Sequence, residues 1–147
     1  MVDSKKICVD ASLVLKLVIR ESDSGVALRL WTEWIGQGME ITAPFLLAFE
    51  TTSVIRNRVY RQDLTLEEGE SAFEIIHSLD ITFLNPDSLY KTAWELAKQF
   101  NRPAAYDSHY LALARILDCP LWTADKRLYN TVNNELTWVK WLGNLSL

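Results

Sequence analysis

The sequence predicts an α/β fold built around a mostly parallel sheet. Short apolar runs, each about the length of one strand, alternate along the chain with longer stretches of helical periodicity. No internal repeat, low-complexity tract or Pro/Gly-rich linker interrupts this alternation. The chain has 147 residues, of which 49% are hydrophobic and 23% charged, and these values are typical of one globular domain. We therefore expect residues 1–147 to form a single domain with a buried core.

The first part of the chain contains two short apolar runs that are typical of buried strands. Between them, Ser12 is a candidate N-cap of one helix, and Gly36 and Gly38 end a second, longer helix. The second run is followed by Pro44, which suits the first turn of a third helix. The predicted elements are strands at residues 6–10 and 39–43 and helices at residues 13–19, 24–35 and 44–60.

The alternation continues to the end of the chain. Thr65 and Glu68 have the spacing of a capping box at the start of a helix. Pro86 helps to start the next helix, and Pro103 breaks the chain before a further one. The predicted elements are helices at residues 65–79, 85–100, 105–117 and 126–132, strands at 80–84 and 121–123, and a last edge strand at 137–141.

Four acidic residues occur where a folded chain rarely places carboxylates. Asp10 and Asp125 follow apolar runs and fall at the carboxyl ends of predicted strands, where open parallel sheets bind ligands. Glu50 interrupts the apolar face of a helix, and Asp107 opens the apolar stripe of another. Buried carboxylates are costly unless they are paired, hydrogen-bonded or bound to a cation. Together the four suggest an oxygen-rich site for a hard divalent metal ion.

Each acid also has a purely structural interpretation. Asp10 and Asp125 could serve only as helix N-caps, and Asp107 could complement the dipole of its helix. Glu50, in the middle of a helix, could form a salt bridge with a nearby arginine. The occurrence of all four placements in one chain favours the metal site.

The net charge of −4 argues weakly against a nucleic-acid partner. Without the four candidate ligands, however, 15 acidic residues balance the 15 basic ones. A bound cation would reverse the sign of the charge locally. The global charge therefore excludes no class of partner.

Composition also bears on the cellular compartment. Cys8 and Cys119 lie in or beside apolar runs, so we expect buried free thiols in a reducing compartment. No run approaches the roughly 18 apolar residues of a membrane span, and the first residues lack the apolar segment of a signal peptide. We expect a cytoplasmic protein with no membrane partner.

The segments around the acids also match a known family in order, approximate spacing and surroundings. They are Val9-Asp10-Ala-Ser12, the helix with Glu50, Tyr106-Asp107-Ser-His-Tyr-Leu-Ala-Leu-Ala114 and Leu121-Trp-Thr-Ala-Asp125-Lys-Arg-Leu128. In these segments the chain resembles PIN domains, and its length is similar to that of VapC-type toxins of toxin–antitoxin pairs. The resemblance implies a three-layer α/β/α fold and a metal-dependent endoribonuclease.

The resemblance carries the four acids over as catalytic and metal-binding residues, and the chemistry of hard divalent ions suggests a role for each. Asp10, Asp107 and Asp125 are expected to make most contacts to Mg²⁺ or Mn²⁺, while Glu50 ligates through water or orients the nucleophile. The four carboxyl groups should then surround a shared, cation-sized space. Without metal their charges repel, so one or more of their pKa values should be raised. The family's hydroxyl positions match Ser12 and Thr123, which could support the acids or a scissile phosphate, or could only cap helices or face solvent.

The expected partners are an RNA substrate, a cognate antitoxin protein and a second copy of the chain in a homodimer. The basic residues near the acids could contact RNA phosphates or could form an ordinary solvated face. The tryptophans could belong to the core or to docking and dimer surfaces. The candidate phosphate contacts are Arg56, Arg58, Arg61, Arg102, Lys126 and Arg127, and the tryptophans in question are Trp31, Trp34, Trp138 and Trp141.

Three other readings fit an aspartate at the end of a first strand. Haloacid-dehalogenase-like phosphatases need a second aspartate two residues later, where this chain has Ser12. Response-regulator receivers need an adjacent acid pair, whereas this strand offers only Asp10. A PIN-fold module that binds RNA or protein without cutting is the third alternative. Such a module would be expected to lose ligand acids, and this chain retains four.

Overall fold

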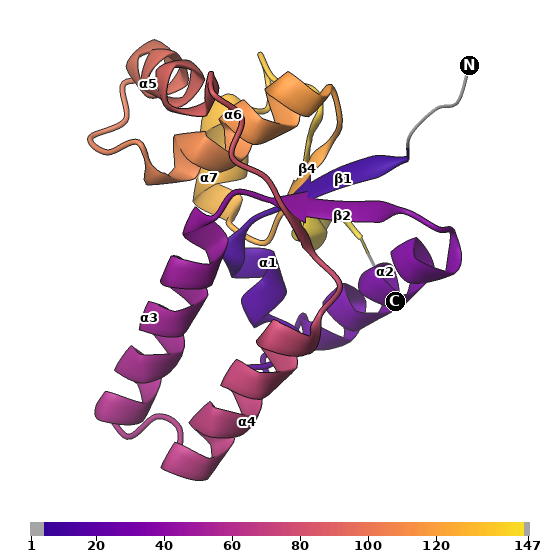
Figure 1. Ribbon diagram of the computed structural model, residues 1–147, viewed down its shortest axis with the longest axis vertical. Coiled ribbons are helices and arrows are strands. Elements are labelled where there is room, and N and C mark those ends of the chain that lie inside the picture. The colour runs from indigo at the N-terminus through magenta and orange to yellow at the C-terminus, as the bar shows by residue number, and fades with distance from the viewer. Residues whose placement is uncertain (1–4, 146–147) are drawn as a thin grey trace.

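A computed structural model describes residues 5–145, in which a five-stranded sheet lies between two layers of helices (Figure 1). The strand order is β3-β2-β1-β4-β5, and every neighbouring pair is parallel. The strands are β1 (Lys6–Val9), β2 (Glu40–Ala43), β3 (Thr82–Phe83), β4 (Leu121–Thr123) and β5 (Val139–Trp141). The predicted three-layer α/β/α fold with a parallel sheet is confirmed.

The helices cover both faces of this sheet. On one side α6 packs on β1 and β4 with α5 outside it, and on the other α1 and α2 contact β4 and β2 (Figure 1). The pair α3 and α4 forms a hairpin that projects away from the sheet (Figure 1). The helices are α1 (Ala11–Leu15), α2 (Ser24–Gly36), α3 (Leu46–Tyr60), α4 (Leu66–Ser78), α5 (Leu89–Gln99), α6 (Tyr106–Leu117) and α7 (Lys126–Val132), and a short 3₁₀ helix follows at Leu142–Asn144.

Strand register determines which residues meet at the functional edge. Strand β1 is central, and Val9 pairs with Trp122 of β4. Both strands run in the same direction, so the residues that follow them leave the sheet at the same edge. Asp10 and Asp125 therefore emerge side by side in space although 115 positions separate them in sequence.

Local signals account for most helix boundaries, with two corrections. The predicted capping box of Thr65 and Glu68 is present at the start of α4. The N-cap of α1 is Asp10 and not Ser12, because the Asp10 carboxylate accepts the Leu13 N–H, and the helix spans Ala11–Leu15 instead of residues 13–19. Helix α5 begins at Leu89, four residues later than the predicted start at residue 85, since a turn precedes it.

Two predicted strands are shorter than expected. The third strand is limited to Thr82–Phe83, where it pairs with the last two residues of β2, and the last strand is limited to Val139–Trp141. Both lie at the edges of the sheet, where only one neighbour is available for pairing. The sequence pattern alone does not reveal how much of an edge strand will be paired.

The tryptophans of α2 belong to the core. Trp31 and Trp34 are buried, with their ring centroids 5.9 Å apart, and Trp34 lies 5.8 Å from Trp122 of β4. These two residues therefore hold α2 against the sheet, and the alternative that they form a docking surface was wrong. Trp138 and Trp141 are half-buried, and Trp141 stacks on Tyr129.

Both cysteines are buried and free, as predicted. Burial raises the pKa of the Cys119 thiol to about 11 and raises that of Cys8 as well, so both are protonated and unreactive at neutral pH. Within residues 5–145, no helix combines the length and apolar character that crossing a membrane requires.

Candidate active site

Asp10 is the most buried acid of the proposed site, with only 5% of its surface exposed. Its Oδ1 accepts hydrogen bonds from the Ser12 hydroxyl at 2.7 Å and from the Leu13 N–H at 3.1 Å, and its Oδ2 accepts one from the Thr123 hydroxyl at 2.5 Å. Burial raises the pKa of Asp10 to about 6, although these hydrogen bonds oppose the rise, and the charge of Asp107 adds to it. The carboxylate is thus held in one orientation at an electrostatic cost.

Two hydroxyl groups connect the ends of β1 and β4. The oxygens of Ser12 and Thr123 lie 3.2 Å apart. Ser12 also accepts the Ala124 N–H at 3.0 Å, and Thr123 accepts the Asp125 N–H at 2.9 Å. This network fixes the turn after β4 relative to the turn after β1, so the two predicted hydroxyl positions orient the acids.

Asp125 begins α7 as its N-cap. Its Oδ1 accepts the backbone N–H groups of Arg127 and Leu128 at 2.9 and 3.1 Å. Both strand-end acids therefore cap helices, as the structural interpretation proposed. Capping does not exclude metal binding, because the capping contacts of Asp125 use a single carboxylate oxygen.

Glu50 is half-buried in α3, and its partner is a hydroxyl group instead of a cation. The Tyr110 hydroxyl of α6 donates to the Glu50 carboxylate. Burial raises the pKa of Glu50, the Tyr110 hydrogen bond lowers it, and the nearby charges of Asp107 and His109 raise and lower it respectively. Among residues 5–145, Glu50 takes part in no ion pair, so the structural alternative of a salt bridge with an arginine is not found.

Asp107 lies in the first turn of α6 and forms an ion pair. The Arg102 guanidinium, from the segment between α5 and α6, donates to Asp107 Oδ2 at 3.0 Å. Their side chains are 26% and 40% exposed, so the pair contributes about 1 kcal/mol at most. Arg102, predicted as a phosphate contact, is instead turned towards an acid of the site.

The four acids occupy one region without forming a closed cage. Asp107 is close enough to raise the pKa values of both Asp10 and Glu50, and Asp125 is joined to Asp10 through Thr123. However, residues 5–145 contain no group of three or more His, Cys, Asp or Glu side chains close enough to hold a metal ion. The expected shared, cation-sized space is therefore not found in this arrangement. Repulsion provides the physical reason, since acids without a cation turn to other partners.

The donor chemistry of the site fits a hard divalent ion. All four candidate ligands offer carboxylate oxygens, which Mg²⁺ and Mn²⁺ prefer. Burial is the main cause of the raised pKa values of Asp10 and Glu50, and the charge of Asp107 adds to both, so a cation would stabilise the charged carboxylates. Arg102 occupies only Oδ2 of Asp107, and breaking this half-exposed ion pair to admit a metal ion would cost little free energy.

The predicted phosphate contacts of α3 lie along the helix away from Glu50, whereas Lys126 and Arg127 directly follow Asp125. Arg56 is placed over the ring of Tyr60, 5.8 Å from its centroid, and Arg61 pairs with Asp63 at 3.2 Å. Arg61 follows Glu50 by eleven residues, or about 16 Å along a helix. The remaining candidates are Arg58, which shares this half of α3, Arg127, which is exposed, and Lys126, which lies over the Trp141 ring.

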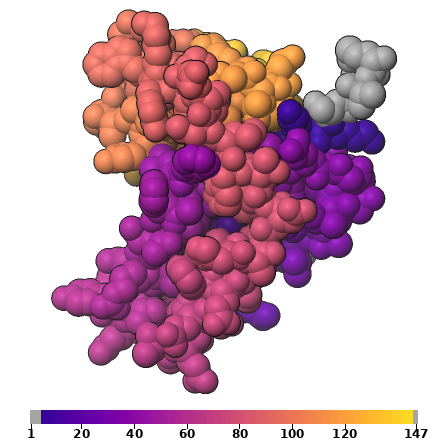
Figure 2. All heavy atoms as spheres, viewed as in Figure 1, coloured from indigo at the N-terminus to yellow at the C-terminus, as the bar shows by residue number. Residues whose placement is uncertain are grey.

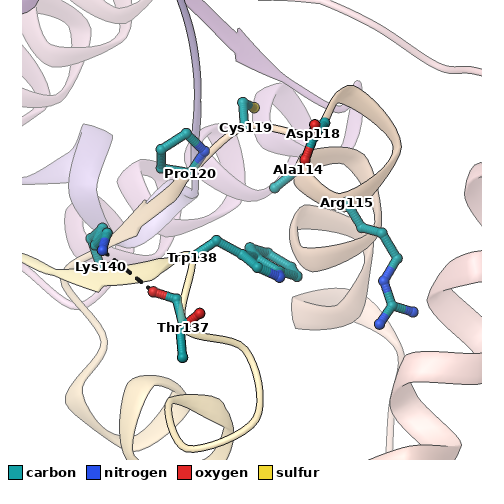
Figure 3. A pocket seen from close by; sticks show the side chains of 8 residues that line it. All are labelled: Ala114, Arg115, Asp118, Cys119, Pro120, Thr137, Trp138 and Lys140. Carbon is teal, nitrogen blue, oxygen red and sulfur yellow. Dashed lines mark hydrogen bonds between the residues drawn. The ribbon is translucent and has the colours of Figure 1, made fainter.

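One well-formed pocket lies away from the acids. It has a volume of about 410 Å³ and is lined by residues at the end of α6 and at the start of β4 and β5, with the Trp138 indole and Arg115 along its wall (Figure 3). Pro120 and Cys119 place it at the amino-terminal ends of the strands, the edge opposite to Asp10. We assign it no part in the chemistry of the acids.

Sequence reasoning missed two contacts within the site, Tyr110–Glu50 and Arg102–Asp107. A signal for the first was present, because Tyr110 follows Asp107 by three residues and places a hydroxyl on a stripe otherwise made of leucine and alanine. The second had no such signal, since a lone arginine before a helix has many possible partners.

Comparisons with known proteins place this arrangement in a family. The family model of the PIN domain matches residues 7–134, which include all four acids. The ribonuclease VapC9 of Mycobacterium tuberculosis is 31% identical over 125 residues, which cover 85% of this chain and 90% of VapC9.

Solved structures agree on the fold. The toxin VapC20 of Mycobacterium tuberculosis, described as cleaving the sarcin–ricin loop, superposes with a TM-score of 0.65 at 20% identity, covering 86% of this chain and 95% of VapC20. The structure of VapBC-1 from nontypeable Haemophilus influenzae gives a TM-score of 0.60 at 14% identity, covering 92% of this chain and 96% of that one.

Proposed function

The chain belongs to the PIN domain family, and on that basis we propose that it is a metal-dependent endoribonuclease that acts as the toxin of a type II toxin–antitoxin pair. The observation that carries the proposal is the convergence of Asp10, Glu50 and Asp107 within electrostatic range at the carboxyl edge of the sheet. The relative VapC9 is named a ribonuclease, which supports an RNA substrate.

In this proposal Asp10, Asp107 and Asp125 hold Mg²⁺ or Mn²⁺, and Glu50 contributes through a bound water. A divalent ion in such a site acidifies water and stabilises the negative charge that develops on a phosphate during hydrolysis. The three proposed ligands come from three separate helices. Asp10 is the N-cap of α1, Asp107 lies in the first turn of α6, and Asp125 is the N-cap of α7.

The remaining side chains position these groups. Ser12 and Thr123 keep the Asp10 carboxylate in one orientation, and Tyr110 does the same for Glu50. A Glu50 carboxylate with a raised pKa is suited to accept a proton from an attacking water. Once Arg102 is released from Asp107, its guanidinium is available to bind an RNA phosphate.

We also propose the partners and the compartment. A cognate antitoxin restrains the enzyme, a second copy of the chain forms a homodimer, and the protein acts in the cytoplasm. The similarity to the toxin VapC20 supports the first. The free, buried thiols of Cys8 and Cys119 fit a reducing compartment.

One observation favours the alternative of a PIN-fold module that binds RNA or protein without cutting. The Arg102–Asp107 ion pair already neutralises one acid, and the carboxylates do not form a closed cage. A catalytically inert protein could keep this pair permanently.

Cleavage of a labelled RNA with added Mg²⁺, with added Mn²⁺ and with a chelator separates the two functions. The Asp10→Asn variant provides the control for contaminating nucleases. We expect cleavage only by the wild-type protein with metal. RNA binding without cleavage under all conditions would establish the inert module.

A further inference from the structure

Exposed aromatic residues immediately precede the two half-buried acids in the sequence. Phe49 precedes Glu50 in α3, and Tyr106 precedes Asp107 in α6. The two aromatic residues are 69% and 61% exposed. Adjacent Cα atoms are about 3.8 Å apart, so each ring starts within one residue of a carboxylate of the proposed site. Single exposed apolar residues are common on protein surfaces. Phe49 and Tyr106 indicate a binding surface only if further exposed aromatic residues lie near them.

Further exposed aromatic residues accompany Phe49 and Tyr106. On α3, Phe45 is also exposed and lies four residues before Phe49, on the same face of the helix. On the other side of the site, Tyr90 of α5 is exposed, and its ring meets His109 of α6 edge-on with the centroids 5.7 Å apart. His109 is in turn close enough to Glu50 for the two to interact electrostatically. Aromatic surface thus flanks the acids from two sides.

A hydrogen bond sets the relative position of these two sides. The Tyr110 hydroxyl of α6 donates to Glu50 of α3. Tyr106 lies one turn before Tyr110, so it is on the side of α6 that faces the start of α3. Figure 2 shows the first turns of α3 (purple) directly beneath the salmon and orange surface of α5 and α6.

We propose that Phe49 and Tyr106 stack on the unpaired nucleobases that flank the scissile phosphate. The inference rests on the proposed function, because it assumes that the acids act on an RNA phosphate. Each ring belongs to a residue next to an acid of the site, so a base beside a phosphate held by the acids would lie within its reach. Aromatic stacking accepts any base, but it requires bases that are not paired and stacked within a duplex.

The surroundings favour nucleobases over a protein segment as the occupant. The rings of Phe49 and Tyr106 stand separately, each next to a carboxylate. The chain has a continuous apolar groove elsewhere, between α3 and α4, and neither residue lines it. An amphipathic protein segment fits that groove better, because its lining includes Ile55, Val59 and Phe73.

Binding of two strands with equal numbers of phosphates tests the proposal. One is a labelled oligoadenylate of roughly 12 nucleotides, and the other is a sugar-phosphate strand of the same length without bases. Fluorescence anisotropy is measured with Mg²⁺ in the Asp10→Asn background, which prevents cleavage. The variants are Phe49→Leu, Tyr106→Leu and Tyr106→Phe. Tyr60→Leu is the matched control, because Tyr60 is 74% exposed at the opposite end of α3. Circular dichroism checks that each variant is folded.

We expect Phe49→Leu and Tyr106→Leu each to weaken binding of the oligoadenylate about 10-fold and to leave binding of the base-free strand unchanged. Tyr106→Phe and Tyr60→Leu should retain the affinity for both strands. Equal losses for the two strands, or no loss for either, would overturn the proposal. It would also be overturned if the leucine variants kept RNA affinity but lost a copurifying protein, since the rings would then form a protein interface. If the Asp10→Asn protein bound neither strand, the RNA function itself would fail and the inference with it.

Discussion

The two sides of the acid site differ in how firmly they hold their carboxylates. At the ends of β1 and β4, Asp10 is buried and accepts three hydrogen bonds that leave it one orientation. At the starts of α3 and α6, Glu50 and Asp107 are half-exposed, and each has a single side-chain partner that can be exchanged. In the proposed metal site, the fold would therefore hold one side ready in advance, and the other side would be completed when the ion binds.

The difference follows from where the four acids originate. Strand register fixes the ends of β1 and β4 relative to each other. Helices α3 and α6 meet at this edge mainly through the Tyr110–Glu50 contact, so their acids can adjust. Rigid acids suit selection of a metal, and adjustable ones suit its entry and exit.

Loss of cleavage is the largest effect that we expect. Asp10→Asn, Asp107→Asn and Asp125→Asn should each reduce RNA cleavage by at least about 100-fold, because each removes a charged ligand without removing volume. Rates are measured with labelled RNA and Mn²⁺, with Asp87→Asn as a control on an exposed acid. Unchanged cleavage in all three variants would end the metal-site interpretation.

In the metal-free protein, the buried Asp10 should also make the free energy of unfolding depend on pH. Folding raises the pKa of Asp10 from 3.8 to about 6, because burial disfavours its charged form. The folded state therefore binds the proton more tightly than the unfolded state. This stabilisation is fully present below about pH 4 and is lost as the pH rises through about 6, a change of about 3 kcal/mol at most.

Urea unfolding in a chelating buffer between these pH values measures the effect. The difference in unfolding free energy between the wild type and Asp10→Asn should grow as the pH rises, with the variant more stable at pH 7. A constant difference across this range would mean that Asp10 keeps an ordinary pKa in the folded protein.

Removing a hydroxyl that supports the fixed side should have an intermediate effect. Thr123→Val leaves one Asp10 oxygen and the Asp125 N–H without their partner, which should cost about 1–3 kcal/mol of stability. Cleavage should fall as well, because Asp10 loses its orientation. Thr52→Val is a suitable control, since Thr52 is an exposed threonine of α3. Equal stability of Thr123→Val and the control, measured by urea unfolding, would show that the hydroxyl network is not needed.

The smallest effect is expected from the basic end of α3. Replacing Arg56, Arg58 and Arg61 with alanine should weaken RNA binding and reduce its salt slope by about 0.7 for each RNA phosphate that is no longer neutralised. Two of these side chains already have partners within the protein, so we expect a change of a few-fold. Binding at several salt concentrations measures the slope, and manganese binding provides the control. An unchanged slope would assign these arginines to a solvated face.

The sequence predicts the fixed side better than the adjustable one. Short-range signals such as the capping box of Thr65 and Glu68, or an acid directly after an apolar run, depend on neighbouring residues. Asp10 and Asp125 could be placed at one edge because parallel strands end together. For these features a single sequence contains the required information.

Contacts between distant elements could not be predicted in the same way. Tyr110 reaches Glu50 across 60 positions, and this depends on the angle between α3 and α6. The burial of Trp31 and Trp34 depends on how α2 sits on the sheet, and a helix face rich in tryptophan fits a core and a docking surface equally well. The length of β3 depends on pairing with β2. Periodicity records which face is apolar but not what covers it.

Manganese located by anomalous diffraction tests the central claim most directly. Crystals of the wild-type protein grown with Mn²⁺ should show an anomalous peak bounded by the carboxylates of Asp10, Asp107 and Asp125, with Arg102 turned away from Asp107. The position of Asp10 should match that in the metal-free protein, while Asp107 should have moved. A peak elsewhere, or no peak while Arg102 still binds Asp107, would contradict a metal site with one fixed and one adjustable side.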